Sequence, residues 1–174
     1  ALSKLSYAKN YGTNAHYYKL TVNIDLSGAN WQPICSNGIT GWPGSEWYAN
    51  GDYAFGGGFD GNNKTITLKI DSAGSYAMGL FSGLRGTIKN LTVNGSVNAA
   101  GYSGAVVGRV YNGALIEGVT NNANVTAAGE HIGGLVGTAI NNSVATFKNC
   151  VNNGSVTGAK SHVAGILGQA YASI

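Results

Sequence analysis

The sequence predicts an all-β protein, a right-handed parallel β-helix, and three observations support this prediction. Short apolar motifs recur in the same order at an interval of about 30 residues. Each repeat unit holds three short segments that are rich in β-branched residues and separated by Gly and Asn, a pattern that disfavours helices. Charge is sparse, since 10% of residues are charged and 44% are apolar, while Gly occurs 28 times. Three strands per coil describe a solenoid whose coils must stack to bury their inner side chains.

The strongest repeat is a four-residue motif that starts at Gly79, Ala105, Gly134 and Gly165. Its successive copies lie 26, 29 and 31 residues apart. Because further motifs keep almost the same interval, we interpret the period as that of one coil. A second motif begins at Ile88, Ile116 and Phe147, and a third ends at Val97, Val125 and Val156.

Stacking of the coils predicts which side chains form the core. Equivalent positions of successive coils should lie above one another at the ~4.8 Å strand spacing. Cys150 takes the place that Leu91 and Val119 hold in earlier coils, so we expect these three residues to form one inward row. Cys35 lies several coils away, beyond the ~7 Å Cα separation that a disulfide allows, which predicts two free thiols. A second inward row is predicted to consist of Leu80, Val106, Leu135 and Ile166.

Two regions are predicted along the chain, an N-terminal cap region at residues 1–30 and the β-helix at residues 31–174. We expect the irregular N-terminal part of the chain, which includes residues 18–24 and 31–34, to cover the open edge of the first coil. An uncovered strand edge would promote aggregation. Too few residues follow Gly168 to complete a coil, so we expect the β-helix to be truncated at its C-terminal edge.

No cofactor or metal ion is expected. Residues 55–66 read as a strand, a tight turn and a second strand, and no Glu follows Asp60 and Asn62 at the spacing of a calcium loop. His131 and His162 each precede the Gly-rich motif by three residues, so they should stack on adjacent coils. Two histidines at such an edge could hold a metal ion, but exposed positions on the rungs explain them without one.

The order of these motifs resembles that of bacterial surface proteins with GLUG-motif repeats, found also as an accessory segment of IgA-specific metallopeptidases. The matching residues are 31–34, 55–66 and the four Gly-rich repeats, which together cover most of the chain after residue 30. One copy, residues 134–137, fits Gly-Leu-x-Gly in full, whereas Ser82, Ala105 and Ile166 depart from it. The resemblance implies an extracellular or cell-surface β-helical module of a multidomain protein, and it implies no particular ligand.

The sequence favours a non-catalytic stalk or adhesive module over an enzyme. It contains no His-Glu-x-x-His motif, which a peptidase of the resembled group would need. A polysaccharide lyase or glycosidase remains a more distant alternative, because such enzymes need neighbouring acidic residues, and of the seven acids only Glu46, Asp52 and Asp60 lie near one another. With a net charge of +3 and no run of basic residues, nucleic acid is not an expected partner. No apolar stretch approaches the ~20 residues of a membrane-spanning helix.

An aromatic loop at residues 42–53 is the best candidate for ligand binding. Aromatic rings beside carboxylates and amides can stack on a sugar and hold its hydroxyl groups, which makes a carbohydrate-binding module the first alternative. The same rings could instead fold back over the core of the first coil. A host or cell-surface glycan or protein is the expected partner, besides further domains of the parent protein. The candidate residues are Trp42, Glu46, Trp47, Tyr48, Asn50, Asp52 and Tyr53.

Overall fold

The computed structural model describes residues 16–36, 54–140 and 144–171. Within these ranges the regular structure consists of strands alone, and all of the strand pairs are parallel. None of the described segments forms a helix of the length and apolarity that a membrane crossing requires. The all-β, parallel β-helical fold that the sequence predicts is therefore confirmed.

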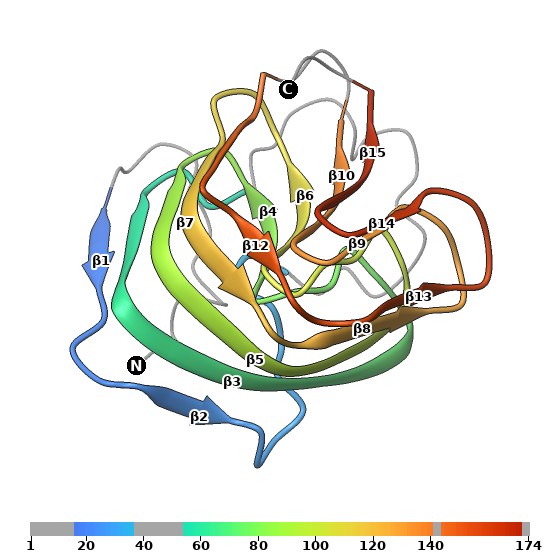
Figure 1. Cartoon of the computed structure of the whole chain (residues 1–174), viewed down its shortest axis with the longest axis horizontal. Helices are drawn as coiled ribbons and strands as arrows, with labels where there is room; N and C mark the ends of the chain where they lie inside the picture. The colour runs from blue at the N-terminus through green and yellow to red at the C-terminus, as the bar shows by residue number, and fades with distance from the viewer. Residues whose placement is uncertain (1–15, 37–53, 141–143, 172–174) are drawn as a thin grey trace.

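Three parallel sheets make up the solenoid (Figure 1). The largest includes β1 (Tyr17–Lys19), β2 (Ile24–Leu26), β3 (Gly58–Tyr76), β5 (Thr87–Gly101), β7 (Leu115–Asn121), β8 (Asn124–Ala127), β11 (Thr146–Lys148), β12 (Val151–Asn152) and β13 (Val156–Gly158). The second is ordered β15 (Leu167–Ala170), β10 (Val136–Ala139), β6 (Val107–Val110) and β4 (Phe81–Leu84). A short third sheet pairs β9 (Ile132–Gly133) with β14 (Val163–Ala164).

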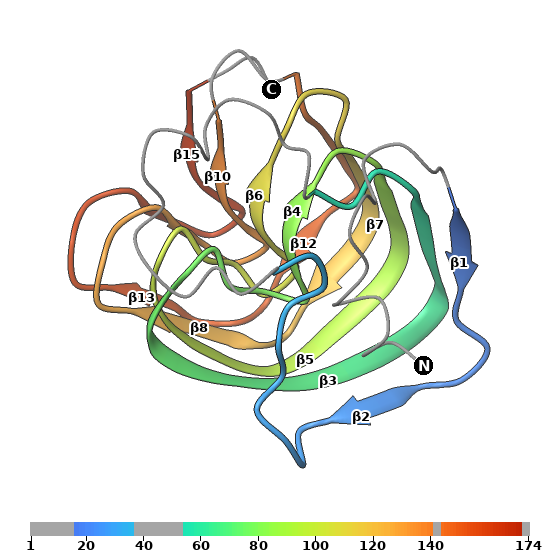
Figure 2. The same cartoon turned by 180° about the vertical axis from the view of Figure 1, so that it is seen from behind.

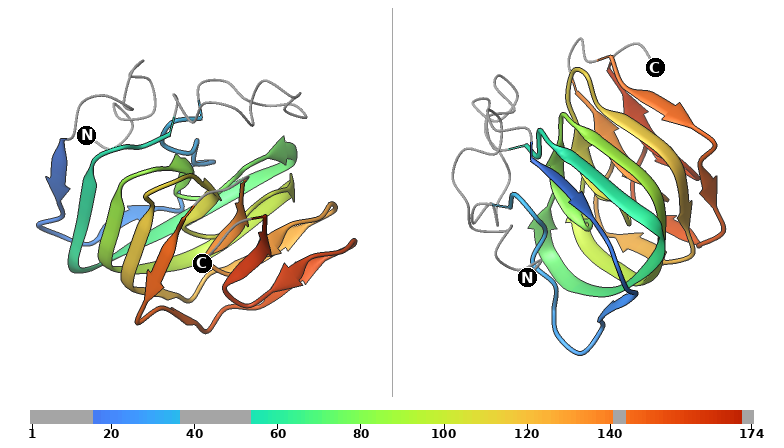
Figure 3. Two further views of the ribbon diagram at one scale, coloured as in Figure 1. Left: turned by 90° about the horizontal axis from the view of Figure 1, so that it is seen from above. Right: turned by 90° about the vertical axis from the view of Figure 1, so that its left-hand side faces the viewer.

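Each coil passes through the largest sheet and the four-stranded sheet, and the last two described coils also contribute the short third sheet. The long strands β3 and β5 curve around one side of the molecule, and the four-stranded sheet lies across the interior from them (Figures 1 and 2). Each coil contributes one strand to that four-stranded sheet, which gives four coils in the described part of the chain. Successive coils lie side by side along the solenoid axis (Figure 3). The core fills the space between the sheets, where the rings of Phe59 in β3 and Phe81 in β4 meet edge to face at 5.4 Å.

Both predicted core rows are confirmed. Leu91 pairs with Val119 in register, and both side chains are buried. In β12, Val151 pairs with Thr120, so Cys150, one residue earlier, lies beside Val119 and continues the same row. Its side chain is partly buried and packs against the core. The second row is fully buried in its first three coils and partly buried in the last described coil, which has a neighbouring coil on one side. Its members are Leu80, Val106, Leu135 and Ile166.

The two cysteines are free thiols, as predicted. Cys35 is buried, and its burial raises the pKa of its thiol to about 12. Cys150 is half-buried, and its pKa is raised by the same cause to a lesser extent. Because the thiolate is the reactive form, both sulfurs are poorly nucleophilic at neutral pH.

The N-terminal segment is more regular than its sequence indicates. β1 and β2 pair in parallel with β3, and Ile34 forms a bridge to Phe81, so this segment extends the sheets by a partial coil. The indole Nε1 of Trp31 donates a hydrogen bond of 3.3 Å to the Leu80 carbonyl oxygen. Strands of three residues are too short to show an alternating pattern, which is why the sequence did not reveal them. The boundary at residue 30 stays a prediction.

The tight turn expected near Asp60 is a corner within the single strand β3. Asn62 and Asn63 adopt left-handed conformations, with φ of 50° and 57°, and the pairing with β5 shifts register between Asp60 and Lys64. The Asn62 backbone N–H donates a hydrogen bond of 2.8 Å to Asp60 Oδ1. The corner turns the chain from one part of the coil to the next, and it fixes Asp60 on the outer face of the sheet.

Candidate functional site

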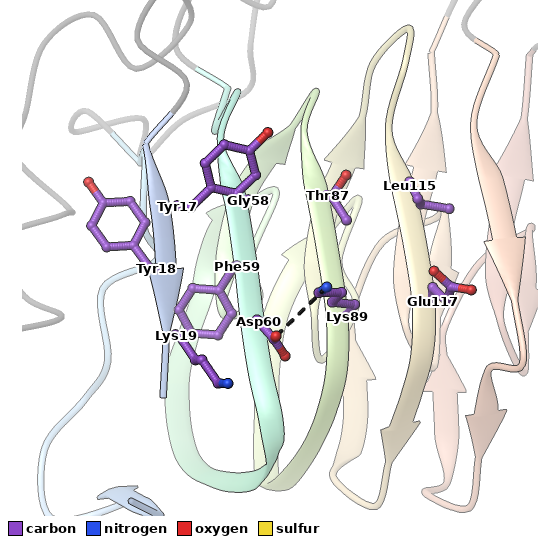
Figure 4. A pocket seen from close by; sticks show the side chains of 10 residues that line it. All are labelled: Tyr17, Tyr18, Lys19, Gly58, Phe59, Asp60, Thr87, Lys89, Leu115 and Glu117. Carbon is purple, nitrogen blue, oxygen red and sulfur yellow. Dashed lines mark ion pairs between the residues drawn. The ribbon is translucent and has the colours of Figure 1, made fainter. Parts of the chain in front are cut away.

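A groove of about 400 Å³ lies on the outer face of the largest sheet, where it crosses β1, β3, β5 and β7 (Figure 4). Because these strands are parallel and in register, each position along the groove repeats on the next strand. Two rows of residues, together with Tyr18 and Phe59, line the groove. One row consists of Tyr17, Gly58, Thr87 and Leu115, and the other of Lys19, Asp60, Lys89 and Glu117.

The second row alternates in charge from strand to strand. Lys19 pairs with Asp60, Asp60 with Lys89, and Lys89 with Glu117, and Lys148 of β11 continues the series. The Lys89 Nζ lies 3.7 Å from Asp60 Oδ2 (Figure 4). Opposite charges in cross-strand positions stabilise a sheet modestly, and like charges there would destabilise it. We name this series of five residues the charge ladder.

Asp60 is held in its charged form. The backbone N–H of Asn62 lowers the pKa of this carboxyl group most, and the Asn90 side chain, at 3.3 Å from Asp60 Oδ1, and the two neighbouring lysines add to the effect. A carboxyl group that stays ionised can accept hydrogen bonds from a ligand or balance its positive charge. It is poorly suited to donate a proton as a general acid.

The other row places an aromatic ring on the surface. Tyr17 is 85% exposed, and its ring lies over Gly58. A Cβ at position 58 would lie 2.3 Å from Tyr17 Cδ1, so Gly58 is required for this placement. Tyr18 points the other way and packs against Phe55, with 6.0 Å between ring centroids. The groove therefore combines one exposed ring with alternating charges.

The seven ligand-binding residues that the sequence suggested do not include any of those in the groove. They fall in residues 42–53, which lie outside the described residues, so that suggestion stays a prediction. The charge ladder had a signal in the sequence. Lys89, Glu117 and Lys148 each follow the first residue of the second repeated motif, but that motif was interpreted through its apolar residues alone.

The predicted stacking of His131 and His162 is confirmed, since their ring centroids lie 4.8 Å apart. The prediction that both histidines are exposed is wrong for His131, because this residue is buried and only 3% exposed. Tyr102 of the preceding coil meets the His131 ring edge-on at 4.4 Å, and His162 of the following coil covers its other side. The burial therefore results from stacking between two neighbouring coils.

Comparisons with known proteins add context to this geometry. No family model matches the chain. Halomucin of Haloquadratum walsbyi is 34% identical over an alignment of 144 residues that covers 78% of this chain and 1% of halomucin. A solved structure of a Bacteroides ovatus protein that is proposed to be an immunoglobulin A1 protease matches with a TM-score of 0.62 and 21% sequence identity. That match covers 97% of this chain and 59% of the other chain, and it shows that the two share a fold.

Proposed function

We propose that this chain is a non-catalytic β-solenoid module of a secreted or cell-surface bacterial protein, in which it acts as a stalk or adhesive segment. The observation that carries the proposal is the continuous stack of coils, whose repeated motifs serve the packing of one coil on the next. The match to about 1% of halomucin fits a module within a very long protein. The name of halomucin is that of a mucin-like protein, which supports a secreted or surface location in this proposal.

The glycines of the repeated motif have a packing role that supports this proposal. A Cβ on Gly108 would lie 2.4 Å from the carbonyl carbon of Ala77, and one on Gly137 would lie 2.3 Å from that of Tyr102. Gly168 makes the same kind of contact, 2.5 Å from the Ile132 nitrogen. Each glycine thus admits the backbone of the preceding coil, so the Gly-rich motif is explained without a bound ligand. We include the resemblance to GLUG-repeat proteins in the proposal, because the glycines of that motif have this packing role here.

The state of two carboxyl groups also favours a non-catalytic role. A glycoside hydrolase needs an acid whose pKa is raised so that it can protonate the leaving group. The pKa of Asp60 is lowered, and so is that of Asp25, whose Oδ1 accepts hydrogen bonds from the Ser27 hydroxyl at 2.6 Å and from its backbone N–H at 2.8 Å. Both groups are therefore suited to remain charged.

Two measurements test the proposal. Antibodies against the chain should label intact cells of the producing organism, and labelling that requires lysis would contradict an extracellular location. The purified chain should release neither reducing ends nor unsaturated uronates from a panel of polysaccharides. Product formation that is lost in Asp60→Asn would show that the groove is catalytic.

Glycan binding in the groove is a second candidate function, favoured by the exposed Tyr17 ring beside the charge ladder. Ring faces stack on the C–H surfaces of sugars while charged groups hold hydroxyls. Tyr17→Ala should abolish binding on a glycan array without changing the melting temperature, because an exposed ring contributes little to folding. Tyr171→Ala, which removes a ring that is 49% exposed elsewhere, is the matched control.

The aromatic loop at residues 42–53 is the competing surface for the same function. If it binds the glycan, Trp42→Ala or Trp47→Ala should abolish array binding at an almost unchanged melting temperature, and Tyr17→Ala should have no effect. A loss of several degrees without a change in binding would show instead that these rings cover the first coil.

A further inference from the structure

A cluster of three possible metal ligands lies at the start of β9 and β14, apart from the groove. One ligand atom from each of Glu130, His131 and His162 lies within 4.8 Å of the other two. The cluster joins two coils, because Glu130 and His131 precede β9 while His162 precedes β14, and β9 pairs with β14. Figure 1 shows these two strands adjacent in the middle of the molecule.

The backbone aligns the two imidazoles. His131 and His162 adopt left-handed conformations with φ of 63° and 62°, and Tyr102 shares this conformation one coil earlier, with φ of 52°. This conformation is uncommon for residues with a side chain. Because it repeats at the same place in each coil, the side chains point in the same direction and stack as a row, Tyr102 to His131 to His162.

His131 carries a buried polar atom that this part of the chain leaves unsatisfied. Its Nδ1 is buried and has no hydrogen-bond partner among the described residues. Buried polar atoms without a partner are uncommon because each loses its hydration without replacement. A bound cation is one way to satisfy a lone pair at such a position.

The cluster sets one carboxylate beside its two imidazoles. Glu130 supplies a negative charge that would offset part of the charge of a divalent cation.

We propose that Glu130, His131 and His162 form a zinc site that fastens two successive coils together. Two imidazoles and one carboxylate are a ligand set that Zn²⁺ accepts in tetrahedral geometry, with a fourth position for water. Ligand atoms around tetrahedral Zn²⁺ lie about 3.3 Å apart, given metal–ligand distances of about 2.0 Å. The three ligand atoms now lie within 4.8 Å of one another, and rotation of the Glu130 and His162 side chains would bring them to the separation that zinc needs. Such rotation is possible because His162 is exposed and Glu130 is partly exposed.

A neighbouring polar group is placed to orient the carboxylate. The Ser161 hydroxyl donates a hydrogen bond of 3.3 Å to Glu130 Oε2, and such outer contacts fix the direction of metal ligands in proteins. The Gln169 amide nitrogen lies 3.4 Å from His162 Nε2. On binding zinc, the amide of Gln169 would have to turn so that His162 Nε2, or its other ring nitrogen, can face the metal.

Titration of the purified full chain with Zn²⁺, followed by calorimetry, tests the site. We expect one equivalent of zinc with a dissociation constant of about 10 μM or tighter. His162→Gln should weaken binding at least about tenfold, and Glu130→Gln should weaken it to a similar degree, since each removes one of three ligands. His16→Gln, which removes an exposed histidine next to β1, is the matched control and should bind zinc as the unchanged chain does.

Two further readouts separate the site from adventitious binding. Zinc at about 100 times its dissociation constant should raise the melting temperature by about 5–10 °C in the unchanged chain, and the rise should be absent in His162→Gln. Co²⁺ should give visible absorption bands that persist in Cys150→Ser, because sulfur is not a proposed ligand. Absence of binding at 100 μM zinc, equal binding by His162→Gln, or binding without a rise in melting temperature would overturn the proposal.

Discussion

Gly137 lies directly against Tyr102 of the preceding coil, so closely that a Cβ at position 137 would be 2.3 Å from the Tyr102 carbonyl carbon. The same contact joins Gly108 to Ala77 one coil earlier. Because the obstacle in both cases is backbone, which cannot rotate away, the glycine sets how closely one part of a coil approaches the next. The stability of the solenoid should depend on this contact.

Gly137→Ala should therefore destabilise the protein by about 2 kcal/mol or more, since the coil must shift to admit a methyl group. Gly74→Ala is the matched control, because a Cβ at position 74 meets no atom within 4 Å. It should change the free energy of unfolding by less than about 0.5 kcal/mol. Urea denaturation followed by circular dichroism measures both, and similar effects of the two substitutions would show that the close approach has no energetic role.

Leu135→Ala should cost about 2–5 kcal/mol, because it empties space in a fully buried row between two coils. Val144→Ala removes a side chain that is 56% exposed and should be nearly neutral. The same denaturation experiment compares them. A cost below about 1 kcal/mol for Leu135→Ala would mean that the row is not part of the core.

Asp60→Asn should reduce the dependence of stability on pH in the acid range. The folded-state pKa of Asp60 is lowered from its ordinary value of 3.8, so the charged carboxylate contributes stability above that pH, and the contribution is lost as pH falls through the folded pKa. Because the group is partly exposed, the contribution should stay below about 1 kcal/mol. The difference in unfolding free energy between the two proteins should thus shrink from pH 7 to pH 2. A constant difference would contradict this account.

The two thiols should react at very different rates. Cys35 is buried and its pKa is raised to about 12, so it should stay unmodified by a thiol reagent at pH 8 until the protein unfolds. Cys150 is half-buried and should react in the native state, though more slowly than a free cysteine. Mass spectrometry after timed labelling identifies the modified residue. Early modification of Cys35 would show that the first coil opens readily.

The sequence by itself determined the period of the solenoid and the residues that share a row. The interval between Gly-rich motifs predicted that Leu135 stacks between Val106 and Ile166, and the second motif predicted the place of Cys150. These predictions were possible because parallel coils of nearly equal length bring residues one period apart to the same position. The free state of both cysteines followed from the same stacking.

The tertiary structure alone decided which rows meet across the coil and what covers their side chains. The sequence placed His131 in a row with His162 but not between Tyr102 and His162, where it becomes buried. It also gave no sign that Tyr17 would lie over Gly58 beside the charge ladder. A period states which residues are neighbours along the solenoid axis. It does not state how the coil bends in cross-section, and that bend, fixed by left-handed residues and by glycines against backbone, decides which side chains meet across the coil.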